Sequence, residues 1–139
     1  MKPLEGTTPE QFVADFFTSY VQDVVHSGDD PGPLADRYYA PDIVQISDGM
    51  ELDREGLLAH ARTLRKNLLD CRFEVHEALA AEGRIAARFT IHARMRKGPA
   101  VAREVHMFGE LTPEGRLRRV TQLSRTLPAT AVRPEQEQR

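Results

Sequence analysis

The sequence predicts an α+β fold, in which a curved antiparallel sheet packs against three helices from the first half of the chain. Two segments in that half, residues 9–28 and 54–69, carry apolar residues at helical spacing. Residues 84–111 form two runs in which apolar and polar side chains alternate, which is typical of strands with one buried face. Most strand-like segments follow the helical ones, and this grouping indicates an α+β protein.

The first helix is expected to follow a flexible lead-in at residues 1–8. Thr8 can cap it, and Pro9 suits the first helical position, where a missing N–H costs no hydrogen bond. Gly28 is expected to end it. Its broad apolar stripe indicates that it lies across a sheet. The stripe contains Phe12, Val13, Phe16, Phe17, Tyr20, Val21, Val24 and Val25.

A turn at residues 29–32 leads into a short second helix, predicted to run from Pro33 to Tyr39. Pro41 is expected to close this helix, because the residue before a proline avoids the helical region. A short strand at residues 43–47 and a turn at Asp48-Gly49 follow.

Asp53 can cap a third helix, from Arg54 to about Leu69. Its apolar stripe faces inward, while three basic residues are expected to face water: Arg62, Arg65 and Lys66. Strands are then expected at residues 71–80, 84–96, 104–111 and 116–127, joined as a meander. A polar tail at residues 129–139 is expected to be disordered.

The central hairpin is predicted to pair about Pro99. In this register Arg94 lies opposite Glu104 and Ile91 lies opposite Met107, so that charges pair on one face and apolar groups on the other. The same register places Arg88 opposite Glu110, Ala93 opposite Val105 and His92 opposite His106. A slip of one residue would move every apolar side chain to the polar face.

Composition restricts the class of protein. A chain of 139 residues is one domain by size, expected here at residues 9–128. The net charge of −2 gives no reason to expect a nucleic acid partner, and no apolar run is long enough to span a membrane. Cys71 is the only cysteine, and no signal-peptide pattern begins the sequence, so a cytoplasmic location is expected.

Several short motifs occur in order between residues 9 and 127: Tyr39-Ala40-Pro41-Asp42, Asp48-Gly49, Phe73-Glu74-Val75, Gly83 to Arg88, Val105 to Phe108 and Glu114 to Leu117. Together they resemble the nuclear transport factor 2-like superfamily, and within it the SnoaL-like polyketide cyclases and ketosteroid isomerases. The resemblance implies a cone-shaped, cystatin-like α+β roll, often a homodimer, with a ligand cavity between the helices and the concave sheet.

The catalytic residues of these relatives do not carry over. The position of the isomerase base corresponds to Ser47, with Asp48 beside it, and the position of the oxyanion-hole acid corresponds to Met107. The isomerase tyrosine corresponds to Val21, with Tyr20 beside it. The SnoaL-like cyclases use an aspartate on the last strand, and this sequence has no aspartate after Asp70. The chain therefore resembles the scaffold and departs from both chemistries.

Three residues are candidates for catalysis. Asp48 would accept a proton if burial raised its pKa; the alternative is a turn that faces water. His60 could act as a base near neutral pH; the alternative is a histidine on the flank of a helix. Tyr20, like Tyr39, could donate a hydrogen bond to a carbonyl or enolate oxygen; the alternative is ordinary core packing.

The last strand allows two orientations. Simple pairing of Leu111 with Leu117 points Thr121 and Leu123 inward, whereas the resemblance points Val120, Gln122 and Ser124 inward. A β-bulge after Leu117 would reconcile the two. The second orientation predicts a neutral ligand-binding lining that consists of Tyr39, Gln45, Ser47, Phe89, Met107, Gln122 and Ser124.

Three histidines on neighbouring strands, His76, His92 and His106, could bind zinc, but their spacing is not that of a metal motif. We expect instead that their face of the sheet is exposed or packs on a second subunit, and we expect neither a metal nor a cofactor. The sequence thus predicts a small-molecule-binding protein, with an isomerase or cyclase that acts by proton transfer as the first hypothesis. A non-catalytic binding or accessory protein and a structural dimerisation module are the alternatives.

Overall fold

The computed structural model describes residues 4–128. Along these residues the elements follow the order α1 (Pro9–Tyr20), η1 (Val21–Val25), α2 (Pro31–Ala35), β1 (Tyr39–Ser47), β2 (Met50–Leu52), α3 (Arg54–Asn67), β3 (Leu68–Ala81), β4 (Arg84–Met95), β5 (Val101–Leu111) and β6 (Leu117–Thr126). The expected polar tail at residues 129–139 and the first part of the lead-in lie outside the described residues. None of the described helices is long and apolar enough to cross a membrane.

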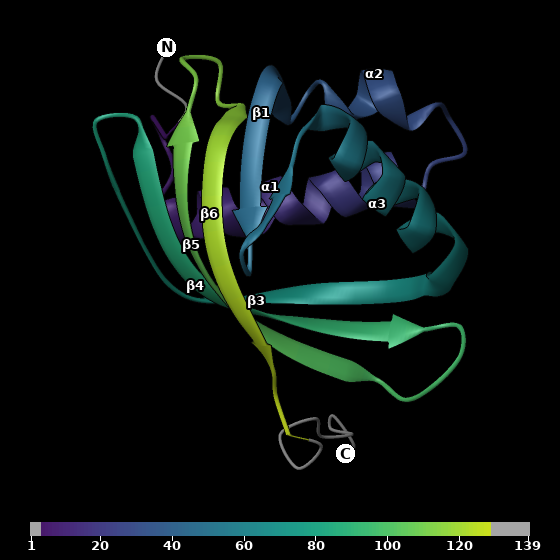
Figure 1. Ribbon diagram of the computed structural model, residues 1–139. Helices are drawn as coiled ribbons and strands as arrows, with labels where there is room; N and C mark the ends of the chain where they lie inside the picture. Colours follow the sequence, from purple (N-terminus) through teal and green to yellow (C-terminus); the bar gives the residue numbers. More distant parts are fainter. Residues whose placement is uncertain (1–3, 129–139) are drawn as a thin grey trace.

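The strands form one six-stranded sheet in the order β2-β1-β6-β5-β4-β3. The sheet is mixed rather than antiparallel throughout, because β1 runs parallel to β6. It curls strongly, and α1 and α3 lie against its concave side (Figure 1). A register shift between Val75 and Glu77 interrupts the pairing of β3 with β4, and such a bulge bends a strand. The α+β cone predicted from the sequence is therefore confirmed.

The central hairpin is present, but its predicted register is wrong by four residues. Arg88 pairs with His106 and Phe89 pairs with Val105, so the pairing is centred on Lys97 and not on Pro99. The chain turns at Gly98, whose φ of 88° places it in the left-handed region, and Pro99 stays outside the ladder. Since the error is an even number of residues, the two faces of each strand are as predicted.

Local capping rules account for the helix starts. The Thr8 side chain accepts a hydrogen bond from the Gln11 N–H, and the Asp53 side chain accepts one from the Gly56 N–H. The first helix changes to a π-helical turn, η1, before it ends at His26. Both predicted boundaries around α2 are wrong, because Asp30 caps a helix that ends at Ala35.

β1 accordingly begins at Tyr39 and contains Pro41, which was expected to close the preceding helix. The pairing of β1 with β6 shifts register between Tyr39 and Val44, so Pro41 lies in the irregular part of the ladder. A proline is tolerated there because the missing N–H interrupts no regular ladder hydrogen bond.

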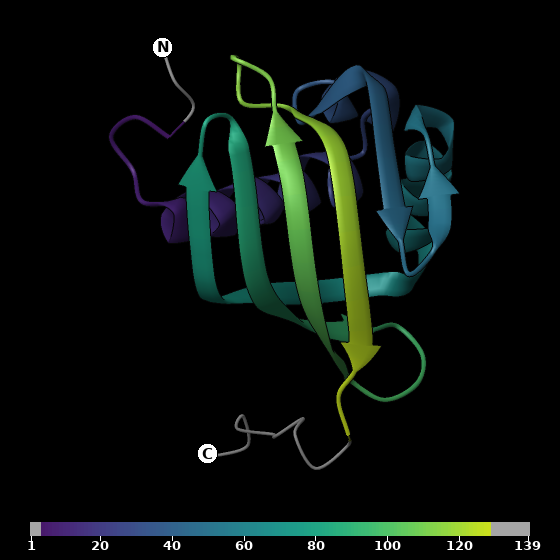
Figure 2. The same cartoon turned by 60° about the vertical axis from the view of Figure 1, so that its left-hand side comes forward.

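The core lies between the helices and the concave face, with Val13, Val24, Ile43 and Ile85 almost fully buried. Figure 2 shows the opposite, convex face of β4, β5 and β6, with α1 behind the strands. Three large apolar side chains on this face are exposed: Leu79, Phe108 and Leu123.

Candidate functional site

A cavity of about 220 Å³ lies between the helices and the concave face of the sheet. Its walls come from α1, η1 and α3 on one side and from all strands except β2 on the other. Most of the lining is apolar, as is usual for small-molecule sites. The apolar lining residues are Phe17, Val21, Leu57, Leu64, Leu68, Cys71, Phe73, Phe89, Ile91, Ala93, Met95, Val105, Met107, Leu117 and Val120.

Three aromatic rings form one wall of the cavity. The ring of Phe17 stacks on that of Phe73 at 5.6 Å between centroids, and it lies 5.1 Å from that of Phe89. These rings come from α1, β3 and β4, so they join a helix to the β3 edge of the sheet. A planar apolar molecule fits such a wall, because aromatic faces favour stacked contacts.

Five polar side chains complete the lining: Tyr20, Tyr39, Gln45, His60 and Gln122. Among the described residues that line the cavity there is no aspartate, glutamate, lysine or arginine. The polar part of the site therefore consists of neutral hydrogen-bonding groups and one histidine. Such groups can orient a carbonyl or hydroxyl oxygen without binding a strongly charged ligand.

Tyr20 and Tyr39 form a pair at the junction of the helices with β1. Their rings lie 5.6 Å apart at an interplanar angle of 72°. Burial raises the pKa of Tyr20 to about 12, although the charge of Arg65 and a hydrogen bond with Tyr39 act in the opposite direction. Burial also raises the pKa of Tyr39 well above its ordinary value. Both phenols therefore remain protonated at neutral pH and are able to donate hydrogen bonds.

His60 lines the cavity from α3, while part of its side chain remains exposed to solvent. Desolvation lowers the pKa of His60 below its ordinary value of 6.5, because the charged form loses hydration. The imidazole is therefore mostly neutral at pH 7, which is the form that accepts a proton. It is the one histidine among the cavity-lining residues that the structure describes.

The last strand contains the predicted bulge. β5 and β6 pair as Leu111 with Leu117 and as Glu110 with Arg119, so one extra residue lies on β6. Beyond this bulge, Gln122 lies opposite Met107 and lines the cavity. The inward orientation that the resemblance implied for Gln122 is confirmed.

Two predicted lining residues lie outside the lining. Ser47 accepts a hydrogen bond of 2.9 Å from the Gln45 side-chain amide, so it contacts a residue of the cavity wall. The Ser124 hydroxyl donates a hydrogen bond to Asp48, and it accepts one from Arg103 at 2.7 Å. Ser124 therefore belongs to a surface cluster.

Asp48 is also absent from the cavity lining. It lies in the β1–β2 turn with a φ of 51°, and its side chain is exposed. Hydrogen bonds from the side chain and the backbone of Ser124 lower its pKa, with a smaller contribution from Arg103. The prediction of a buried Asp48 with a raised pKa is wrong, and the turn that faces water is the interpretation that fits.

The histidines of the convex face have separate partners. His76 is hydrogen-bonded to Thr90 at 2.7 Å, and His92 contacts Glu74 at 2.8 Å. No group of three possible metal ligands occurs among residues 4–128.

Arg65 is a residue whose position the sequence prediction missed. It was expected to face water, but its Nε atom donates a hydrogen bond of 2.7 Å to the Val24 carbonyl oxygen. The sequence spacing does indicate this inward position, because Leu58, Ala61 and Arg65 follow each other at helical intervals on one face of α3. Arg65 was predicted to face water because it is charged, in spite of this spacing.

Both the sequence and the fold are similar to those of known proteins. The family model of the SnoaL-like domain matches residues 13–120. Among curated proteins, none matches this sequence.

Solved structures with the same fold have low sequence identity to this chain. A SnoaL-like polyketide cyclase from Agrobacterium tumefaciens has a TM-score of 0.57 at 17% identity, over 87% of this chain and 94% of that one. A conserved protein from Planctomyces limnophilus has a TM-score of 0.61 at 14% identity, over 83% and 94% of the two chains. A protein of ketosteroid isomerase-like fold from Catenulispora acidiphila, in complex with trimethylamine, has a TM-score of 0.58 at 12% identity, over 78% and 83%.

Proposed function

Because this chain belongs to the SnoaL-like domain family, we propose that it binds a small, largely apolar carbonyl compound and catalyses its isomerisation or cyclisation by proton transfer. The observation that carries this proposal is that a neutral histidine and a protonated phenol, His60 and Tyr20, line the same apolar cavity. A base and a hydrogen-bond donor are the two groups that enolisation requires.

Each group has a separate role. His60 takes a proton from the carbon beside the carbonyl, and the electron pair of the C–H bond moves onto the carbonyl oxygen. Tyr20, assisted by Tyr39, donates a hydrogen bond to that oxygen. Return of the proton to another carbon completes an isomerisation. In a cyclisation, the enolate carbon attacks a second carbonyl of the same molecule, and the new alkoxide takes the proton from His60.

The remaining lining residues serve binding. Gln45 and Gln122 orient a further oxygen atom of the ligand, while Phe89 and Met107 contact its apolar part. The stacked rings of the aromatic wall favour a planar ring system.

A non-catalytic binding protein is the second candidate function. It is favoured by one observation, namely that no carboxylate lines the cavity in the described part of the chain. A protein of this kind would use the same neutral groups only to orient its ligand. The third candidate, a structural module with a filled core, is disfavoured by the cavity of about 220 Å³.

We also propose that two copies associate through the convex face of the sheet. Leu79, Phe108 and Leu123 are exposed there to 77%, 73% and 65%. A groove of about 290 Å³ runs between Leu79 and Phe108 and is bordered by Glu77, Arg88 and His106. An apolar centre with a charged rim is typical of an interface between subunits.

Exchange of the α-protons of 2-tetralone, a bicyclic ketone, tests the proposal. Bound and free ketone are followed in D₂O by NMR, with ligand-induced signal shifts as the measure of binding. We expect the protein to accelerate the exchange, and His60→Gln to abolish most of the acceleration while binding persists. His26→Gln is the matched control, because His26 is exposed and outside the cavity lining. Binding without accelerated exchange would support the non-catalytic function, and absence of binding would contradict both for this class of ligand.

A further inference from the structure

Arg65 connects α3 to η1, the turn that follows Tyr20. Its Nε atom donates a hydrogen bond of 2.7 Å to the carbonyl oxygen of Val24 in η1. The last carbonyl groups of a helix have no partner within the helix, and η1 ends at His26. Arg65 thus caps the end of this helix with a side chain from another helix. Tyr20 is the residue that directly precedes η1, so the capped turn holds its backbone.

The guanidinium of Arg65 has a hydrogen-bond donor that is not used in the described part of the chain. Its Nη2 atom is buried and has no hydrogen-bond partner in the part of the chain that the structure describes. Arg65 also takes part in none of the ion pairs of residues 4–128. Arg65 is half-buried, and a cation that is partly buried without a counter-ion acts on nearby groups more strongly than an exposed one, because less solvent screens it.

Tyr20 is a group on which this charge acts. Burial raises the pKa of the Tyr20 phenol, and the positive charge of Arg65 acts in the opposite direction. The charge thereby favours negative charge on the Tyr20 oxygen. The rings of Tyr38 and Tyr39 each lie 5.6 Å from the ring of Tyr20. Tyr38 donates its own hydroxyl hydrogen bond to Asp23.

We propose that Arg65 is a positioning residue that prepares Tyr20 to stabilise an oxyanion. It holds the η1 turn in place, and its unpaired positive charge favours negative charge that develops on the Tyr20 oxygen or on a ligand oxygen bound to it. This inference rests on the proposed role of Tyr20 as the hydrogen-bond donor of the cavity.

The test measures the ionisation of the residue 20 phenol without any ligand. Tyr20 is replaced site-specifically by 3,5-difluorotyrosine, whose phenol is more acidic, and its ¹⁹F signal is titrated with pH. We expect Arg65→Met to reduce the ratio of ionised to neutral phenol about tenfold at a given pH, because an opposite charge is lost. Arg65→Lys should restore most of this ratio, since the charge is kept.

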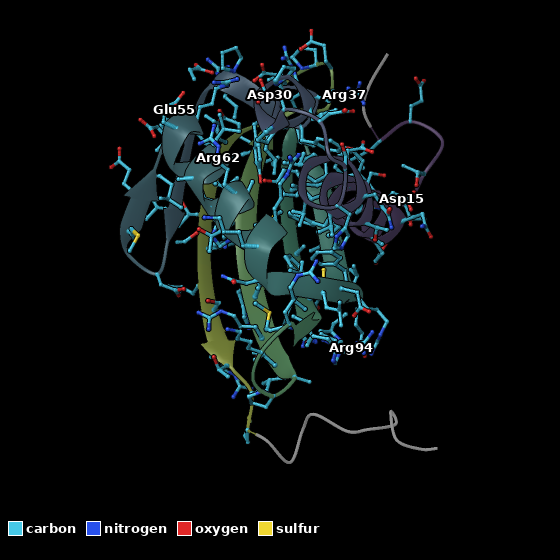
Figure 3. The ribbon with its side chains drawn as sticks, turned by 90° about the vertical axis from the view of Figure 1, so that its right-hand side faces the viewer. Asp15, Asp30, Arg37, Glu55, Arg62 and Arg94 are labelled. Atoms are coloured by element: carbon cyan, nitrogen blue, oxygen red, sulfur yellow. The ribbon has the colours of Figure 1, made fainter. Side chains whose placement is uncertain are left out.

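Arg62→Met is the matched control. Arg62 lies on the exposed side of the same helix and is labelled in Figure 3. Its substitution should leave the titration of residue 20 unchanged. An identical midpoint in the wild type and in folded Arg65→Met would overturn the proposal, because a merely structural Arg65 would not affect the phenol.

A second measurement covers the case in which Arg65→Met does not fold. In the wild-type background, the ¹⁵N signals of the Arg65 guanidinium should move with the same midpoint as the ¹⁹F signal of residue 20. Signals that stay constant through that midpoint would overturn the proposal. Failure of the proposed function has a different signature, namely that 2-tetralone does not bind, whatever the titration shows.

Discussion

The side chain and the backbone N–H of Ser124 both donate hydrogen bonds to the carboxylate of Asp48, at 2.6 and 2.8 Å. The two residues are 76 positions apart, so these bonds join the β1–β2 turn to β6. Arg103 approaches the same carboxylate at 3.6 Å and donates hydrogen bonds to the hydroxyls of Ser124 and Thr126. The cluster keeps Asp48 ionised and exposed at the edge of the sheet.

Loss of the Ser124 hydroxyl should make the stability of the protein less dependent on acid pH. The pKa of Asp48 is lowered in the folded state, so its contribution to stability is present above the pKa of the unfolded chain and is lost as pH falls through the folded pKa. Ser124→Ala should therefore lower the melting temperature near neutral pH and change it little in strong acid. Thermal unfolding over a pH series measures this, and an equal change at every pH would contradict it.

The loss of activity at low pH should follow the protonation of His60. Because desolvation lowers the pKa of His60, we expect its imidazole to titrate below 6.5, and exchange of the tetralone protons to fall as pH drops through that midpoint. Stability should fall over the same range, beginning at the unfolded pKa, since the unfolded chain binds the proton more readily. NMR of the imidazole C–H groups gives the midpoint directly. A value at or above 6.5 would remove the argument for a neutral base.

A side chain at position 109 should overpack the core. A Cβ atom on Gly109 would lie 2.9 Å from Leu117 Cδ2 and 3.3 Å from Ile85 Cγ2, and both neighbours are buried. We expect Gly109→Val to lower the free energy of unfolding by about 1–3 kcal/mol. Gly28→Ala is the control, because a Cβ at Gly28 meets no atom within 4 Å. Urea unfolding should find the control unchanged or stabilised by up to about 1 kcal/mol.

A charge on the convex face should separate the proposed dimer. Phe108 is 73% exposed in the single chain, so Phe108→Glu should leave the fold intact and place a carboxylate in the apolar centre of the interface. We expect the sedimentation coefficient to change from that of a dimer to that of a monomer. Met50→Glu, at an exposed position on β2, serves as the control. A wild-type protein that sediments as a monomer at high concentration would contradict the proposed interface.

Much of the cavity was predictable from local patterns. The alternation from Ile85 to Met95 predicts which side chains of β4 face inward, and Phe89 and Ile91 do line the cavity. The inward position of Gln122 needed a bulge in addition, because simple alternation from Leu117 would have turned it outward. The bulge was suggested by the resemblance to the family and not by the alternation itself.

The positions of the charged residues were less predictable. Asp48 and Arg65 were placed by their residue type and by their immediate neighbours in the sequence. Their actual partners, Ser124 and Val24, lie 76 and 41 positions away. The helical spacing of α3 indicates the side of the helix on which Arg65 lies, but no local pattern identifies either partner.

By itself, the sequence determined the α+β class, the caps at Thr8 and Asp53 and the inward faces of β4 and β5, because these depend on the geometry of a few consecutive residues. Only the tertiary structure decided the register of the hairpin, the exposure of Asp48 and the burial of the Arg65 Nη2 atom. Each of these depends on where a turn places one segment against another. That placement results from packing over the whole fold, for which a single stretch of sequence carries no periodic signal.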